Sequence, residues 1–240
     1  MTFRSICIAV YVFFYLIFTT PERIRLKKLE QTDPQEASRI AQAHVQKVFR
    51  HLLKISGVTI EVNGLETIPD EAALFVGNHS SYFDIIVTGA AIPGGVGFVA
   101  KDSLGNIPGL SSWMKRIHCL FLDRKDIRKG LQTILEGAEY LKEGYSMCIY
   151  PEGTRSTNGE LGEFKGGSLK MAQKAKAPIV PVAIRGTRDI FENNLGLRVC
   201  PSHVTISFGT PFKISELPAA EKKFAGEHAK QAIADMLAQQ

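Results

Sequence analysis

One stretch of this chain constrains its fold more than any other: a short apolar run that ends in glycine and leads directly to a histidine. The apolar run covers residues 72–76, Gly77 follows it, and His79 and Asp84 lie just beyond. A buried strand that ends in this way delivers the imidazole to the rim of a sheet, where open α/β folds bind their ligands. The stretch therefore predicts a strand, a turn and a helix, with a polar pair at the turn.

The spacing of His79 and Asp84 restricts how their side chains can meet. On one ideal helix, residues five positions apart point about 140° away from each other. The two side chains meet if His79 lies in the turn and Asp84 in the first helical turn after it. Asp84 would then accept a hydrogen bond from Nδ1–H and leave Nε2 free as a general base. The alternative is a turn-building histidine beside an unrelated aspartate.

From residue 58 onward, strand-like apolar runs alternate with helical stretches, which is the pattern of an α/β layer fold. We expect strands at residues 58–62, 72–76, 97–101, 119–122, 147–149, 179–184 and 204–208. We expect helices from the histidine turn to residue 91 and at residues 127–141, 167–176 and 217–237. The helix at 127–141 joins two strands over a crossover of βαβ length.

Positively charged side chains follow three of the expected strands. Lys101, Arg124 and Arg155 each come after an apolar run and are expected to converge on the rim that carries His79. Cations beside a neutral histidine suit a dianionic phosphate, which arginine can bind with two parallel hydrogen bonds. For any one of these cations, the alternative is a solvated strand end.

The residues before Arg155 predict a tight ligand-binding turn. Glu152, Gly153 and Thr154 offer a carboxylate, a flexible backbone and a hydroxyl, and glycine lets backbone amides approach a ligand closely. Glu152 is a candidate acceptor for a substrate hydroxyl. The phosphate-loop pattern of nucleotide-binding proteins, Gly-x-x-x-x-Gly-Lys-Ser/Thr, does not occur in the chain.

The N-terminal region predicts contact with a membrane. Residues 6–18 form an uninterrupted apolar run rich in aromatic residues. As a helix this run spans about 20 Å, which is short of the roughly 30 Å hydrocarbon core of a bilayer. No small-residue cleavage site follows, only Thr19-Thr20-Pro21-Glu22, so a retained anchor or a re-entrant helix is favoured over a signal peptide.

A second helix is expected between Asp33, which can cap it, and Gly57, which can end it. Apolar residues repeat at helical spacing along one face, and the opposite face carries Arg39, Lys47, Arg50 and Lys54. A basic amphipathic helix next to an apolar one is typical of an anchor on anionic lipid. The alternative is a helix docked on the rest of the protein with a solvated charged face.

Charge and cysteine content narrow the possible partners. The formal net charge of +5 favours anionic partners, but no nucleic-acid-binding motif accompanies it. The four cysteines are widely spaced, with no pairing typical of a zinc site or a redox motif. Neither a metal site nor nucleic-acid binding is therefore expected.

Four blocks, in this order and at these separations, resemble the acylglycerol-phosphate acyltransferase family. They are residues 78–84, 119–124, 150–156 and 177–184, and the resemblance extends from about residue 58 to residue 212. It implies a mixed sheet flanked by helices, with a catalytic domain at residues 57–240 and a membrane-binding helical element at residues 1–56. It also implies catalytic roles for His79 and Asp84. The residues expected to hold the phosphate and glycerol groups are Lys101, Arg124, Glu152, Gly153, Thr154 and Arg155.

The implied reaction moves an acyl group from a thioester, either acyl-coenzyme A or acyl-carrier protein, to the 2-hydroxyl of lysophosphatidic acid. It needs no cofactor and no metal, and His79 acts as the base. Backbone amides after His79 are candidates to stabilise the oxyanion, because helix N-termini favour anions. The expected location is the cytoplasmic face of a membrane. The alternatives are transfer to another lyso-lipid or to glycerol-3-phosphate, or a non-catalytic module that binds anionic lipid.

Overall fold

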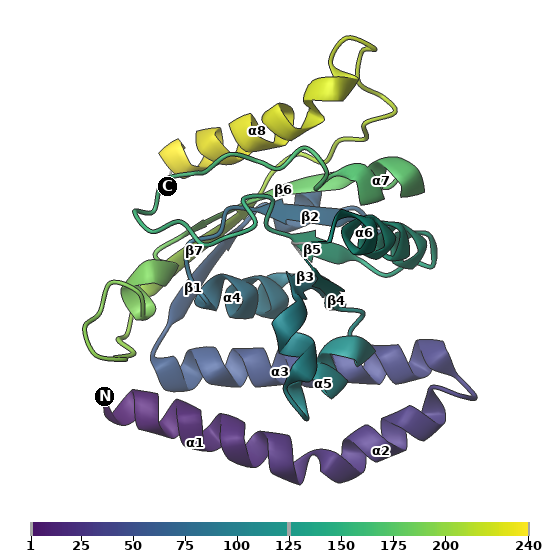
Figure 1. Cartoon of the computed structure of the whole chain (residues 1–240). Coiled ribbons are helices and arrows are strands. Elements are labelled where there is room, and N and C mark those ends of the chain that lie inside the picture. Colours follow the sequence, from purple (N-terminus) through teal and green to yellow (C-terminus); the bar gives the residue numbers. More distant parts are fainter. Residues whose placement is uncertain (1, 124–125, 240) are drawn as a thin grey trace.

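The computed structural model describes residues 2–123 and 126–239, and at its centre lies a sheet with helices on both faces (Figure 1). The strands in these residues are β1 (Thr59–Asn63), β2 (Leu74–Gly77), β3 (Gly97–Lys101), β4 (Leu120–Leu122), β5 (Met147–Ile149), β6 (Ile179–Arg185) and β7 (His203–Phe208). Their order in the sheet is β1-β7-β6-β2-β5-β3-β4. Neighbouring strands are parallel except β6 and β7. The expected mixed sheet flanked by helices is thus confirmed.

The strand that precedes the histidine turn lies in the middle of the sheet. β2 pairs in parallel with β5 on one side and with β6 on the other, and all its residues are buried. Because parallel strands end at the same edge, the segments that follow β2, β5 and β6 meet there. This edge carries the histidine turn, the loop that begins at Pro151, and the turn after Arg185.

The helices form two layers, one on each face of the sheet (Figure 1). They are α1 (Phe3–Phe18), α2 (Thr20–Leu29), α3 (Pro34–Ser56), α4 (Phe83–Ala91), α5 (Leu110–Arg116), α6 (Ile127–Lys142), α7 (Lys170–Ala175) and α8 (Ala225–Gln239). α6, α7 and α8 cover one face, where Leu141 and Ile233 belong to one apolar cluster. α3 and α4 cover the other face, where Val45 and Val87 belong to a second cluster, and α1 and α2 lie outside them.

The C-terminal helix begins later than its apolar pattern predicted. Residues 217–237 were expected to be helical, but α8 begins at Ala225, after a short 3₁₀ turn at Lys222–Phe224. The carbonyl of Pro218 accepts hydrogen bonds from the amides of Glu221 and Lys222, which closes a turn before the helix. The amide of Phe224 then donates to the carbonyl of Glu221, so residues 218–224 form turns and the regular helix follows them.

α3 has the expected caps, but its apolar face is docked on the protein. Asp33 accepts a hydrogen bond from the amide of Glu36 at 3.0 Å, and Gly57 ends the helix in the left-handed conformation. Val45 and Leu53 are buried in the cluster that contains α4, whereas the four basic side chains of the opposite face are exposed. The apolar face of α3 is therefore buried against the protein, as in the docked alternative, and membrane association of residues 1–56 stays a prediction. The division of the chain at residue 56 stays a prediction.

α1 leaves much of its apolar surface uncovered. Its exposed large apolar side chains are Phe3, Ile6, Val10, Val12, Phe13, Phe14, Ile17 and Phe18. Tyr15 attaches the other side of α1 to the protein, because its ring stacks with those of His44 and Trp113. In the described residues, no one helix has the length and apolarity to cross a membrane, although α1 and α2, bent by 48° between them, pass that test as a pair.

Candidate active site

The structure brings His79 and Asp84 together at the carboxyl edge of β2. His79 lies in the turn after β2, and Asp84 lies in the first turn of α4. Nδ1 of His79 is 2.9 Å from Oδ2 of Asp84, whose side chain is fully buried, while that of His79 is 15% exposed. A carboxylate oxygen can only accept, so the neutral imidazole carries its proton on Nδ1. Nε2 is then left with a free lone pair.

Asp84 accepts four hydrogen bonds, which fix its carboxylate in one orientation. Oδ2 also accepts from the backbone amides of Ser80 and Ser81, both at 2.7 Å. Oδ1 accepts from the hydroxyl of Thr187 at 2.5 Å. Thr187 follows β6, the strand that pairs with β2, and sequence reasoning missed it. Its only signal in the sequence is a hydroxyl placed shortly after an apolar strand.

The same contacts correct an expectation about the oxyanion. The amides of Ser80 and Ser81 donate to Asp84, the amide of Tyr82 donates to Glu192, and the amide of Phe83 donates to the hydroxyl of Ser81. The amides after His79 are thus already engaged. They cannot serve as oxyanion donors in this arrangement, because a buried carboxylate in the turn needs donors of its own.

Glu152 ties the histidine turn to the loop that follows β5. One carboxylate oxygen accepts from the amide of His79 at 2.7 Å, and the other accepts from the amide of Gly162 at 3.0 Å. Burial raises the pKa of Glu152, although both amides favour its ionised form. Both oxygens of Glu152 therefore already bind backbone, so its position indicates a support for the turn more than an acceptor for a substrate hydroxyl.

Tyr150 packs against the face of the His79 imidazole. Its ring stacks on that of His79, with 4.3 Å between centroids and 17° between planes. Its hydroxyl lies 3.1 Å from the hydroxyl of Thr88 on α4. Tyr150 directly follows the expected strand at residues 147–149, and its stacked ring fixes the plane of the imidazole.

Arg155 lies beside the first turn of α4. Its Nη1 is 3.0 Å from Oε1 of Glu192, and its guanidinium carbon lies 3.6 Å from the centroid of the Tyr82 ring. Glu192 also accepts from the hydroxyl of Ser81 at 2.6 Å and from the amide of Tyr82 at 2.8 Å. Arg155 is therefore held close to the histidine turn, and Glu192 is a second residue that sequence reasoning missed.

The other residues expected to hold the phosphate and glycerol groups lie in different surroundings. Glu152, Thr154 and Arg155 line a hollow of about 660 Å³. Gly153 has a positive φ of 71°, and a side chain there would meet the ammonium group of Lys165. Lys101 ends β3, which lies two strands along from β2, and its exposed side chain is outside this hollow. Arg124 lies outside the described residues.

An apolar groove of about 330 Å³ begins next to Arg155. Ile8 and Val12 of α1 line one side of it, and Phe83 and Ile86 of α4 line another. Tyr82 also lines this groove, and the Arg155 guanidinium packs over its ring. The groove thus places an apolar surface and a cation next to each other near the imidazole.

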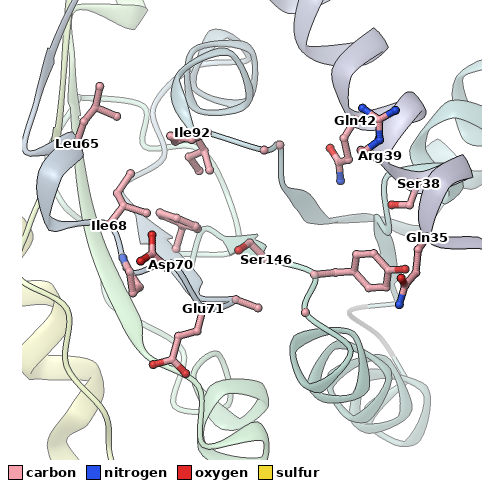
Figure 2. Close-up of a pocket in the computed structure, with 18 residues that line it drawn as sticks. Gln35, Ser38, Arg39, Gln42, Leu65, Ile68, Asp70, Glu71, Ile92 and Ser146 are labelled. Atoms are coloured by element: carbon pink, nitrogen blue, oxygen red, sulfur yellow. The ribbon is translucent and has the colours of Figure 1, made fainter.

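Another hollow, of about 580 Å³, lies at the opposite edge of the sheet, near the residues that precede β2 and β5 (Figure 2). Two of its charged side chains have partners of their own: Arg39 pairs with Glu36, and Glu71 pairs with Lys213. None of the expected site residues lines this hollow. In the part of the chain that the structure describes, no group of three His, Cys, Asp or Glu side chains is arranged to hold a metal ion.

The fold and the site together define an α/β protein with a histidine–aspartate pair at the carboxyl edge of its sheet. The family model described as Acyltransferase matches residues 59–185, which is just over half of the chain. The chain therefore belongs to the acyltransferase family. The matched range contains β1 to β6 and every residue expected at the site.

Relatives agree with this assignment. The chain is 33% identical over 160 residues to a probable 1-acyl-sn-glycerol-3-phosphate acyltransferase of Mycoplasma pneumoniae, covering 64% of this chain and 60% of that one. It is 33% identical over 162 residues to the 1-acyl-sn-glycerol-3-phosphate acyltransferase of Saccharomyces cerevisiae, covering 66% and 54%. The matches thus span a little over half the length of these curated relatives.

A solved structure resembles the whole fold. The crystal structure of the 1-acyl-sn-glycerophosphate acyltransferase PlsC from Thermotoga maritima matches with a TM-score of 0.80 and 25% sequence identity. The match covers 98% of this chain and 95% of that one, so it includes the N-terminal helices as well as the sheet.

Proposed function

We propose that this protein transfers an acyl group from a thioester donor to the 2-hydroxyl of 1-acylglycerol-3-phosphate, which yields phosphatidic acid. The observation that carries the proposal is the imidazole of His79, whose Nδ1 is held by a buried carboxylate and whose Nε2 makes no hydrogen bond within the described residues. The names of the relatives, which are acyltransferases of 1-acylglycerol-3-phosphate, support the choice of acceptor.

In this reaction Nε2 of His79 takes the proton of the acceptor hydroxyl. The hydroxyl oxygen forms a bond to the thioester carbonyl carbon, and the carbon–sulfur bond then breaks. The proton on Nε2 passes to the departing thiolate, which leaves as a thiol. Asp84 stabilises the imidazolium that forms in between. General-base catalysis of this kind accelerates a reaction by roughly 10²–10⁴-fold.

The neighbouring groups suit an acceptor that has a phosphate at one end and an acyl chain at the other. Arg155 offers its guanidinium to the phosphate, and the apolar groove that begins at Tyr82 can take the acyl chain. Arg155 is paired with Glu192 in the structure, so a phosphate would share or replace that contact. Ser80 and Ser81 are not acylated in this scheme, since their hydroxyls lie against Thr187 and Glu192.

The proposal places the enzyme at the cytoplasmic face of a membrane. The exposed apolar side chains of α1 would enter the lipid, and the exposed basic residues 25, 27 and 28 of α2 would lie among anionic headgroups. The apolar groove also has α1 in its lining, so an acceptor could reach it from the lipid.

An assay with several acceptors tests the function. The purified full chain is given acyl-coenzyme A or acyl-carrier protein, together with 1-acylglycerol-3-phosphate, a zwitterionic lyso-lipid or glycerol-3-phosphate. We expect phosphatidic acid to form with the highest kcat/KM among the products. Faster transfer to another acceptor would reassign the substrate. If the protein bound vesicles but formed no acylated product with any combination of donor and acceptor, the non-catalytic lipid-binding alternative would be favoured.

Replacing Arg155 by lysine should weaken acceptor binding. An ammonium group lacks the planar two-donor fork, and losing one charge-assisted hydrogen bond costs about 1.5–3 kcal/mol. We expect the KM for 1-acylglycerol-3-phosphate to rise roughly tenfold while the donor KM stays constant. Arg128→Lys, the same change at an exposed position of α6, is the matched control. A defect confined to the donor KM would place Arg155 on the donor side instead.

Two phenylalanines of α1 should account for much of the vesicle affinity. Phe13 is 60% exposed and Phe18 is 73% exposed. Burying each ring in lipid stabilises binding by about 2 kcal/mol, so Phe13→Gln/Phe18→Gln should weaken binding to anionic vesicles on the order of 1,000-fold. Leu131→Gln/Leu135→Gln alters two exposed leucines of α6 on the other face of the sheet, and should leave vesicle binding unchanged. Equal losses in both double variants, measured by co-sedimentation, would contradict a membrane role for α1.

A further inference from the structure

A second hollow beside the active-site loop is strongly basic. It has a volume of about 460 Å³ and lies between the loop after β5, the start of α7, and the 3₁₀ turn that leads into α8. Among the residues that the structure describes, four lysines and one acid, Glu227, line it. The lysines are Lys165, Lys170, Lys222 and Lys223. We call this site the lysine hollow.

The lysine hollow is continuous with the candidate active site. Phe164 and Lys165 line both this hollow and the one that contains Arg155. The amide of Lys165 donates to the carbonyl of Pro151 at 3.1 Å, which fixes the loop one residue before Glu152. The ammonium group of Lys165 lies against Gly153. A ligand in the lysine hollow can therefore extend past Lys165 to the histidine turn.

The positive charges of the lysine hollow exceed its negative charge, and they are not paired in salt bridges. In residues 2–123 and 126–239, none of its four lysines forms a salt bridge. Lys222 donates to the carbonyl of Ser215 at 2.9 Å, and the Lys223 ammonium lies 4.7 Å from the centroid of the Phe224 ring. Four cations and one acid around a single cavity leave an excess of positive charge, which favours a polyanionic ligand, and lysine is a common phosphate binder.

The position of the hollow indicates a ligand from the aqueous side. Figure 1 shows α7 and α8 on the face of the sheet opposite α1 and α2. If the apolar surface of α1 lies on a membrane, the lysine hollow faces away from the lipid. The lipid acceptor and the ligand of the lysine hollow would then approach the imidazole from different sides.

We propose that the lysine hollow binds the phosphate groups at the nucleotide end of an acyl-coenzyme A donor, whose pantetheine arm runs past Lys165 to bring the thioester to His79. This inference rests on the proposed acyl transfer. A concave site of this volume lies in the range of about 300–1,000 Å³ that small ligands and cofactors occupy. A carrier protein would instead need an interface of roughly 800 Å² on each partner.

The test compares donors that share a thioester but differ in their phosphates. Acyl-coenzyme A carries the phosphorylated nucleotide, and S-acylpantetheine carries no phosphate. We expect Lys222→Gln/Lys223→Gln to lower the preference for acyl-coenzyme A over S-acylpantetheine, as a ratio of kcat/KM values, about tenfold, since two screened charge-assisted contacts are lost. Lys174→Gln/Lys176→Gln removes the same charge from exposed positions outside the hollow and should leave the ratio unchanged.

A binding measurement keeps this inference separate from the proposed function. Titration calorimetry with coenzyme A alone should show binding to the wild-type chain, weakened about tenfold in the Lys222→Gln/Lys223→Gln variant. Lysine-dependent binding without any acyl transfer would leave the site in place and refute the proposed function. The inference would be overturned if the Lys222→Gln/Lys223→Gln variant kept the wild-type ratio of kcat/KM values for acyl-coenzyme A and S-acylpantetheine. It would also be overturned if kcat/KM fell equally with all donors, or fell only with acyl-carrier protein. Absence of coenzyme A binding to the wild-type chain would overturn it as well.

Discussion

Replacing His79 by alanine should lower kcat for acyl transfer about a thousandfold, because the general base that takes the acceptor proton is gone. The fold should survive the change. Asp84 keeps the amides of Ser80 and Ser81 and the hydroxyl of Thr187 as donors, so no buried charge is left unpartnered. The free energy of unfolding should fall by about 1–2 kcal/mol, since the contact with the Tyr150 ring is lost.

The measurement is kcat at saturating donor and acceptor, paired with thermal unfolding. His203→Ala is the matched control, because this histidine lies on β7 with a side chain that is 62% exposed. It should keep wild-type kcat. Vesicle affinity should be unchanged in the His79→Ala variant, whether the protein is an enzyme or a non-catalytic lipid-binding module. If the His79→Ala variant kept the wild-type kcat for acyl transfer, His79 would not be the general base.

The strands and the central polar pair could be predicted because their signals are local. Each expected strand is an apolar run bounded by turn residues, and β1 to β7 all occur within two residues of their expected bounds. The spacing of His79 and Asp84 lets their side chains meet only if one lies in the turn and the other in the first helical turn, and the structure has this arrangement. Local patterns of this kind do not depend on which strands become neighbours.

The residues that complete the site depend on the order of the strands. Thr187 reaches Asp84 because β6 pairs with β2, and periodicity along the chain does not specify that pairing. Glu192 reaches Ser81 and Arg155 from the same segment after β6. Lys101 does not line the hollow that contains Arg155 for the same reason, since β5 lies between β2 and β3. Contacts between segments a hundred residues apart have no signature in one sequence.

The two N-terminal helices show a different limit. An apolar face predicts burial, but it does not distinguish burial in lipid from burial in protein. The amphipathic pattern of α3 was interpreted as a membrane surface, yet Val45 and Leu53 pack against the protein. The exposed apolar surface belongs to α1, which Tyr15 holds through its stack with His44 and Trp113.

Replacing Asp84 by asparagine should lower kcat about a hundredfold and keep the fold. In one orientation, the amide oxygen of asparagine accepts from the Ser80 and Ser81 amides and from Nδ1 of His79. Its NH₂ group then faces Thr187, whose hydroxyl can accept as readily as donate. The reverse orientation points NH₂ at two backbone donors, which is unfavourable. Asparagine should therefore preserve the imidazole tautomer and remove only the negative charge.

The size of the loss in kcat distinguishes a switched imidazole tautomer from the loss of the negative charge at residue 84. An asparagine that imposes the wrong tautomer on a catalytic histidine costs about 10⁴-fold in kcat. Losing the charge from one hydrogen-bonded partner costs about 1.5–3 kcal/mol, which is near a hundredfold in rate. Thr187→Val in the Asp84→Asn background leaves the NH₂ group without an acceptor and should lower the free energy of unfolding by a further 1–3 kcal/mol or so. Steady-state kinetics that show a 10⁴-fold loss would mean that the tautomer has switched, and a loss below threefold would reduce Asp84 to a structural residue.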